Sequence, residues 1–173
     1  MPIHFSVLQK ALKGKHVVVV GNSTKVVENQ EDHTEVCNNA DFVVRMQEGV
    51  ANTRMIPYTG KRCDIYISRK ATYSLQDSCF DTPKFVVWAT PNEPAAPECC
   101  VFLPEDHVDQ LRVQIGSWPT MGARAVYMAL QCGAKVSTVG MGFYSPECNE
   151  VSAAQHNGEN EKRWCLKNGV TIL

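Results

Sequence analysis

KHVVVVGNS, residues 15–23, places four consecutive valines directly before a Gly-Asn-Ser turn. An unbroken apolar run of this kind is typical of a strand that is buried on both faces, as in a parallel α/β sheet. Open α/β sheets bind ligands beyond the carboxyl ends of their strands, where backbone N–H groups favour anions. Gly21, Asn22 and Ser23 are therefore candidate ligand-binding residues, although the same residues also suit an ordinary turn.

The rest of the chain alternates between apolar, strand-like runs and segments with helical spacing. We expect further strands at 40–46, 63–68, 84–89, 101–103 and 135–141 and helices at 3–13, 104–115, 120–131 and 159–167. Strands that are separated by helices imply parallel crossover connections. The pattern predicts an α/β fold with a doubly wound, mostly parallel sheet and helices on both faces.

Length and charge limit the possible classes of protein. With 173 residues, of which 44% are hydrophobic, the chain is long enough for one domain, which we expect to span 1–173. The 17 basic and 18 acidic residues nearly cancel, so neither nucleic acid nor a membrane surface is supported as a partner. No apolar run is long enough to cross a bilayer, and we expect a soluble, cytoplasmic protein. The eight cysteines contain no C-x-x-C pair and are expected to be reduced thiols.

Three further polar residues, Arg45, Gln47 and His156, lie at or beside the end of a predicted strand or the start of a predicted helix. Arg45 and Gln47 follow the second strand-like run, and Arg45 could bind a phosphate or carboxylate or form a surface ion pair. His156 precedes the last predicted helix. A neutral histidine there could serve as a general base, while a histidine in an Asn/Gly-rich loop is also often merely solvated.

Three stretches in this order resemble the sialylmotifs of family 29 glycosyltransferases, the sialyltransferases. VVGNS (19–23) and DFVVRMQ (41–47) are similar to the large motif, and PTMG (119–122) with GMGF (140–143) is similar to the small motif. HNGENE supplies the histidine and glutamate of the very short motif as His156 and Glu161. The resemblance covers most of the chain.

The resemblance implies a Rossmann-like, metal-independent, inverting glycosyltransferase that moves sialic acid or a related acidic sugar from a CMP-linked donor to an acceptor hydroxyl. It implies His156 as the general base, with Glu161 supporting that region. The implied donor nucleotide-binding residues are Gly21, Asn22, Ser23, Arg45, Gln47, Thr120, Met121 and Gly122. No D-x-D motif occurs, so the sequence suggests neither a metal nor another cofactor.

The sequence departs from the family pattern at two of these positions. Gln47 stands where an asparagine is expected, and Met121 stands where a threonine is expected. Two alternatives therefore stay open: a nucleotide-binding module of the same fold without transferase activity, and an enzyme of another class such as a nucleotide hydrolase. The partners we expect are a nucleotide-sugar donor, a glycan or other hydroxyl acceptor and a second copy in a homo-oligomer.

Overall fold

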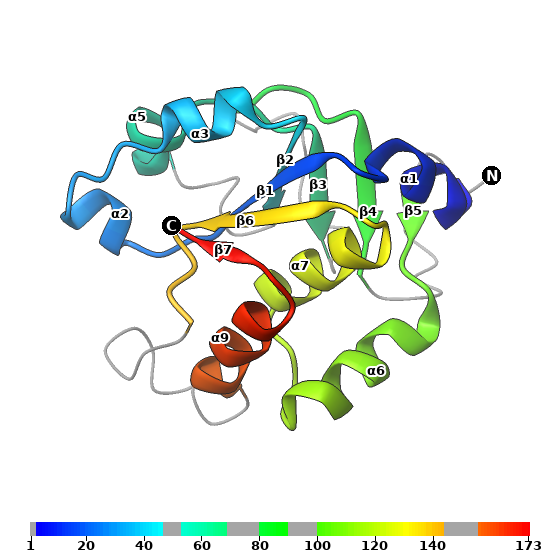
Figure 1. Cartoon of the computed structure of the whole chain (residues 1–173). Coiled ribbons are helices and arrows are strands. Elements are labelled where there is room, and N and C mark those ends of the chain that lie inside the picture. The colour runs from blue at the N-terminus through cyan, green and yellow to red at the C-terminus, as the bar shows by residue number, and fades with distance from the viewer. Residues whose placement is uncertain (1–2, 47–52, 69–79, 90–99, 144–155) are drawn as a thin grey trace.

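Seven strands form one sheet in the computed structural model, which describes residues 3–46, 53–68, 80–89, 100–143 and 156–173 (Figure 1). The strands are β1 His16–Val20, β2 Phe42–Met46, β3 Ile65–Ser68, β4 Phe85–Trp88, β5 Cys100–Phe102, β6 Lys135–Val139 and β7 Thr171–Ile172. They lie in the order β5-β4-β3-β2-β1-β6-β7, and every neighbouring pair is parallel. The predicted α/β fold is confirmed, and the described sheet is parallel throughout.

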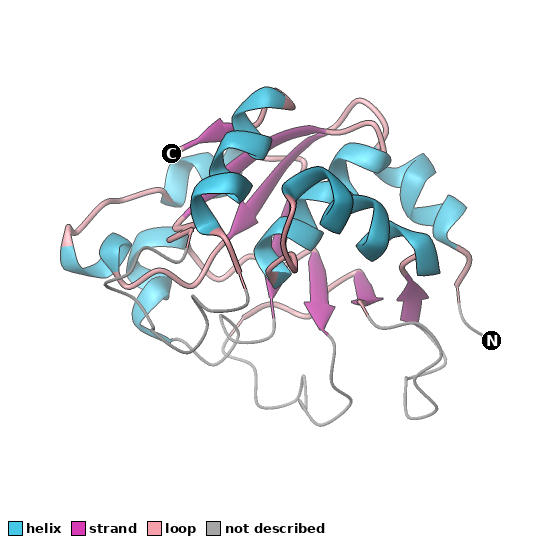
Figure 2. Cartoon of the chain, turned by 90° about the horizontal axis from the view of Figure 1, so that it is seen from below, coloured by secondary structure: helices cyan, strands magenta, loops and turns pink. Residues whose placement is uncertain are grey.

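Helices cover both faces of this sheet, as predicted (Figures 1 and 2). On one face lie α1 Phe5–Leu12, α6 Glu105–Ile115, α7 Met121–Gln131 and α9 Gly158–Lys167. On the other face lie α2 Lys25–Glu28, α3 Thr34–Asn39, the 3-10 helix η1 Thr53–Met55 and α5 Ile56–Thr59. None of the described helices has the length and apolar character that crossing a bilayer requires.

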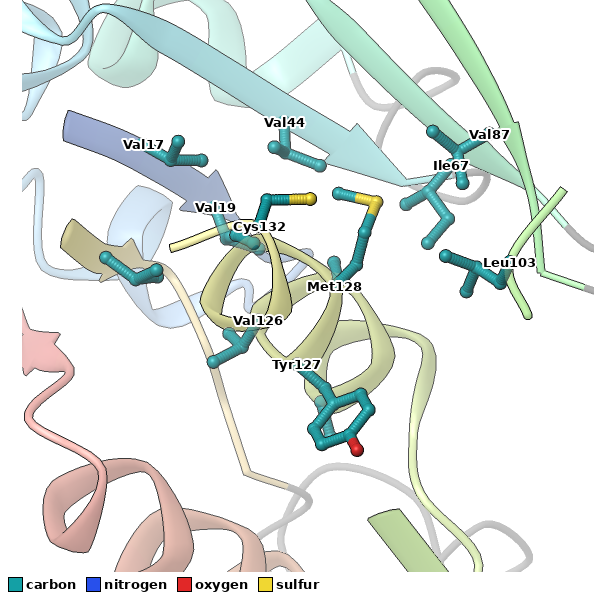
Figure 3. Packing of buried hydrophobic residues seen from close by; sticks show 14 of the residues in the cluster. Val17, Val19, Val44, Ile67, Val87, Leu103, Val126, Tyr127, Met128 and Cys132 are labelled. Atoms are coloured by element: carbon teal, nitrogen blue, oxygen red, sulfur yellow. The ribbon is translucent and has the colours of Figure 1, made fainter. Parts of the chain in front are cut away.

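The valines of β1 supply both layers of the core. Val17 and Val19 point to the side of α7, whereas Val18 and Val20 point to the side of α2 and α3, and none of the four is more than 2% exposed. Figure 3 shows Val17 and Val19 close to α7. Full burial of one valine side chain stabilises the fold by about 1.5 kcal/mol or more, so β1 anchors the sheet from both sides.

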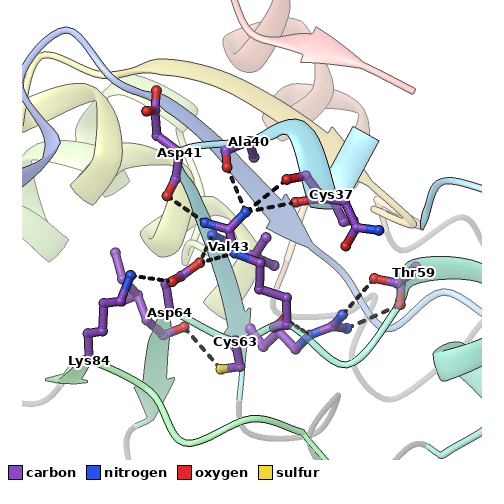
Figure 4. A network of polar contacts seen from close by, with 12 residues as sticks. Cys37, Ala40, Asp41, Val43, Thr59, Cys63, Asp64 and Lys84 are labelled. Atoms are coloured by element: carbon purple, nitrogen blue, oxygen red, sulfur yellow. Dashed lines mark hydrogen bonds and ion pairs between the residues drawn. The ribbon is translucent and has the colours of Figure 1, made fainter. Parts of the chain in front are cut away.

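A network of polar contacts around Arg62 and Asp64 connects the segment before β3 to β2 and to the end of α3 (Figure 4). The Asp64 carboxylate accepts a hydrogen bond from the Val43 N–H at 3.0 Å and pairs with Arg62 at 2.7 Å and Lys84 at 3.0 Å. Arg62 also donates to backbone carbonyls at the end of α3, namely those of Cys37, Asn38, Ala40 and Asp41. The last carbonyls of a helix lack partners within the helix, and a cation satisfies them and complements the helix dipole.

The described cysteines are Cys37, Cys63, Cys100, Cys132 and Cys165, and all five are buried. Cys37, Cys63, Cys132 and Cys165 are free thiols, as predicted. Burial raises the pKa of Cys63, Cys132 and Cys165 to about 12. These thiols are therefore uncharged and unreactive at neutral pH.

The last strand was not predicted from the sequence. β7 is only two residues long and pairs with β6 through Ser137 and Thr138. It extends the sheet beyond β6, and its carboxyl end lies at the same edge of the sheet as the ends of β1 and β6. The C-terminal residues thereby reach the region described next.

Candidate active site

The carboxyl ends of β1 and β6 lie side by side at the point where the strand order reverses. The Gly21 N–H donates to the Val139 carbonyl at 2.7 Å, and the Ser23 N–H donates to the Gly140 carbonyl at 2.9 Å. A Cβ on Gly21 would overlap the Gly140 carbonyl group, so only glycine fits between these strand ends. In open α/β sheets this reversal point forms the ligand-binding crevice.

A pocket of about 650 Å³ opens at this place, which is a normal size for a small-ligand site. Its walls come from the turn after β1 with Ser23, from Gly140–Phe143 after β6, and from the start of α9 with His156. Two members of the predicted site, Ser23 and His156, therefore face one pocket although they lie far apart in the sequence.

The ring of His156 is held by the backbone of the segment before α7. Its Nδ1 lies 2.6 Å from the carbonyl oxygen of Trp118. Because a carbonyl only accepts hydrogen bonds, Nδ1 carries the hydrogen in this contact, and Nε2 is the nitrogen with the lone pair in the neutral ring. This tautomer can accept a proton at Nε2, which is what a general base requires.

The start of α9 is held by its own N-terminal cap and by a hydrogen bond to Ser117, which lies before α7. The Asn157 side chain caps the helix by accepting from the Asn160 N–H at 3.0 Å, and the Asn157 N–H donates to the Ser117 hydroxyl at 3.3 Å. Gly158 is the first residue of the helix, and a Cβ there would overlap the Phe143 carbonyl. The close approach of α9 to the end of β6 therefore depends on glycine.

Glu161 and Thr120 form a buried pair that joins α9 to α7. The two carboxylate oxygens accept from the Thr120 N–H and from the Thr120 hydroxyl, each at 2.7 Å. The same hydroxyl accepts from the Ala123 N–H at 3.1 Å and caps α7. Burial raises the pKa of the Glu161 carboxyl, while both hydrogen bonds from Thr120 act in the opposite direction.

The remaining candidates beside the turn and α7 differ in their surroundings. Oδ1 of Asn22 is buried without a hydrogen-bond partner among the described residues. The side chain of Met121 packs against the core. Gly122 is buried and lies against the side chain of Met141. Neither Asn22 nor the Thr120–Gly122 segment contributes to the pocket walls.

Arg45 has a structural place in the fold. It is 2% exposed, and its guanidinium donates to the carbonyls of Arg62, Thr59 and Gly60 and to the Thr59 hydroxyl at 2.8–3.2 Å. The alternative of a surface ion pair is wrong because the side chain is buried, and we leave Arg45 out of the site proposed below. Gln47 lies outside the described residues.

Several pocket residues carried no signal in the sequence. They are Lys25, Asn29 and Glu31 around α2, Lys162 on α9, and Ile172 and Leu173 at the end of the chain. Each of these residues lies in a segment that is polar or short, and none of them belongs to a motif described above. Only the topology, which brings α2, α9 and β7 to the same edge of the sheet, identifies them.

Comparison with solved structures finds the same fold in two sialyltransferases. A mammalian sialyltransferase in complex with Gal-beta-1-3GalNAc-ortho-nitrophenol is 17% identical with a TM-score of 0.64, over 95% of this chain and 71% of that chain. The sialyltransferase CstII from Campylobacter jejuni, in complex with the substrate analogue CMP-3FNeuAc, is 14% identical with a TM-score of 0.59, over 92% of this chain and 80% of that chain. No family model and no curated protein matches the chain by sequence.

Proposed function

We propose that this chain is a glycosyltransferase that moves sialic acid or a related acidic sugar from a CMP-linked donor to a hydroxyl of an acceptor. The observation that carries the proposal is that one pocket is lined both by Ser23, in the turn after β1, and by His156. The fold supports the choice of donor, because both similar structures are sialyltransferases and one of them holds a CMP-sugar analogue.

The turn after β1 would bind the donor phosphate. The buried side-chain oxygen of Asn22 lacks a partner among the described residues, and leaving such a group unpaired costs about 1–3 kcal/mol. Asn22 does not line the pocket, so a phosphate bound beside Ser23 would reach it only if the amide turned toward the pocket and donated its NH₂ to a phosphate oxygen. Lys25 lines the pocket two residues beyond Ser23 and would add positive charge.

The transfer step would use His156 as the base. Nε2 would take the proton from the acceptor hydroxyl as its oxygen bonds to the anomeric carbon of the sugar. The bond from that carbon to the donor phosphate oxygen breaks at the same time, and CMP leaves with the electron pair. A positioned base of this kind typically contributes about 10²–10⁴-fold to the rate.

Glu161 and Thr120 would act as positioning residues in this mechanism. Their hydrogen bonds fix the start of α7, and the carbonyl that holds the His156 ring belongs to Trp118, two residues before Thr120. The family resemblance implies that Met121 and Gly122 also approach the donor, although neither lines the pocket.

A nucleotide-binding module without transferase activity is the second candidate. It is favoured by one observation, namely that the N–H and the hydroxyl of Thr120 both donate to Glu161 and so already have a partner within the protein. Such a module would still use the turn after β1 and the pocket beside it.

A panel of CMP-sugars, incubated with and without hydroxyl acceptors and followed by mass spectrometry, tests the proposal. We expect acceptor-dependent release of CMP together with a glycosylated product. Binding of CMP without turnover would favour the binding module, and CMP release that does not need an acceptor would favour a hydrolase.

The variant His156→Ala separates chemistry from binding. It should lower the transfer rate by about 10²–10⁴-fold while calorimetry still detects CMP. His4→Ala is the matched control, since His4 lies at the start of α1, outside the pocket. Equal rates for His156→Ala and His4→Ala would refute the assignment of the base.

A further inference from the structure

The segment after β6 presents one side chain between two glycines. Gly140, Met141 and Gly142 all line the pocket, together with Ser23 on one side and His156 on the other. Because glycine has no side chain, Met141 alone determines how far side-chain atoms of this three-residue segment reach into the pocket.

The place of Met141 depends on two glycines from other segments. A Cβ on Gly21 would lie 3.0 Å from the Met141 Cα, and a Cβ on Gly122 would lie 2.8 Å from the Met141 sulfur and closer still to its terminal methyl group. The backbone of Met141 therefore rests on Gly21, and its thioether rests on Gly122. The side chain is partly buried against the core, so it has a defined position rather than free solvent around it.

The geometry of an inverting transfer places the sugar beside this residue. The anomeric carbon must lie between the leaving phosphate and the attacking hydroxyl. If the turn with Ser23 binds the phosphate and His156 binds the hydroxyl, the sugar lies over the segment after β6, because this segment contacts Ser23 at Gly140 and the start of α9 at Phe143.

We propose that Met141 determines the specificity for the donor sugar, with its thioether seated on Gly122 as the apolar wall of the sugar subsite. This inference rests on the proposed function. A methionine side chain is flexible and can be displaced by a small change in its support. A methyl group added at Gly122 would push the thioether away from α7 and into the space that the sugar needs.

The experiment compares two probes, CMP and the unreactive analogue CMP-3FNeuAc, by calorimetry on the full chain. The readout is the ratio of their dissociation constants, because CMP lacks the sugar. Gly122→Ala should weaken CMP-3FNeuAc relative to CMP by about tenfold, as expected for one misplaced methyl-sized group in a pocket. The double variant Gly122→Ala/Met141→Ala should give the same ratio as Met141→Ala alone, because without the thioether the methyl group at position 122 has nothing to displace.

Leu166→Ala is the control, since Leu166 lies on α9, is 55% exposed and is not part of the pocket. An unchanged ratio in folded Gly122→Ala, or a further loss from Gly122→Ala in a chain that already carries Met141→Ala, would overturn the inference. If Gly122→Ala does not fold, Met141→Ala alone decides, because losing the wall should weaken CMP-3FNeuAc and leave CMP less affected. Failure of the proposed function looks different: the original chain would bind neither probe, or would bind them without consuming a CMP-sugar in the presence of an acceptor.

Discussion

The carboxylate of Glu161 accepts two hydrogen bonds from Thr120, one from its N–H and one from its hydroxyl, each 2.7 Å long. Glu161 is 1% exposed and Thr120 is 5% exposed, so water cannot replace either bond. The pair joins the starts of α7 and α9, and the carbonyl that holds the ring of His156 belongs to Trp118, two residues before Thr120. The position of His156 thus depends on the buried contact between Glu161 and Thr120, two residues that do not line the pocket.

Glu161→Ala should therefore destabilise the protein strongly. The change leaves two buried donors of Thr120 without a partner and creates a cavity, which together should cost about 3 kcal/mol or more. Urea denaturation followed by circular dichroism measures the loss. Glu159→Ala is the control, because the Glu159 side chain is 67% exposed and its ion pair with Arg163 contributes little. Equal midpoints for the two variants would contradict the prediction.

Gly158→Ala should impair activity more than stability. A Cβ at this position would overlap the carbonyl of Phe143, so the start of α9 must move away from the end of β6. His156 lies two residues earlier and should move with it, and a displacement of about 1 Å at a catalytic group can lower a rate by about 10²-fold. The turnover of the donor with acceptor present measures the effect. Leu166→Ala, on the same helix but outside the pocket, should keep the rate of the original chain.

Arg45→Ala tests whether the buried guanidinium stabilises the fold. The variant leaves the carbonyls of Arg62, Thr59 and Gly60 without their donor and removes the stacking of the guanidinium on the Phe80 ring at 4.1 Å. We expect a loss of about 2–4 kcal/mol in the free energy of unfolding. Arg54→Ala, at an exposed position, should change it by less than about 0.5 kcal/mol. A nearly neutral Arg45→Ala would show that its contacts are dispensable.

His107 should make the stability depend on pH. Its ring contacts Phe5 and Tyr127 edge-on with centroids 5.2 and 5.3 Å apart, and burial lowers its pKa from 6.5, against a smaller opposite effect of Asp106. The unfolded chain then binds a proton at a higher pH than the folded chain does. The contribution of neutral His107 is thus complete above pH 6.5 and is lost as the pH falls from 6.5 through the lower, folded pKa.

The variant His107→Phe keeps a ring and removes the titration. As the pH is lowered from 7.5 to 5, about the range in which histidine titrates, the original chain should lose free energy of unfolding that the variant keeps. The free energy of unfolding of the variant minus that of the original chain should therefore increase. Chemical denaturation at several pH values measures it. A constant difference would mean that the pKa of His107 does not change on folding.

The sequence predicted the strands well because each is a short apolar run that ends in polar or glycine residues. The valines of β1 are the clearest case, since a run buried on both faces has few other interpretations. No short stretch of sequence predicted the pairing of β1 with β6, because the paired residues, such as His16 and Lys135, are far apart in the sequence. β7 was missed for a similar reason, since two residues carry no periodicity.

The site could be predicted only in part. His156 and the turn after β1 were found through motifs, and the pocket between them required the fold. Arg45 shows the limit, because the same residue at a strand end suits a ligand, a surface ion pair or a buried network. The carbonyls that bind it come from residues 59–62, and their position depends on backbone geometry that no residue type reveals.

The pairing of β1 with β6 also has a kinetic consequence. Contacts between distant parts of a chain form slowly, because the loop between them must close first. β1 can associate early with β2, but β6 emerges from the ribosome only after the intervening strands and helices. The pocket at their junction is therefore expected to be assembled late in folding, when most of the sheet already exists.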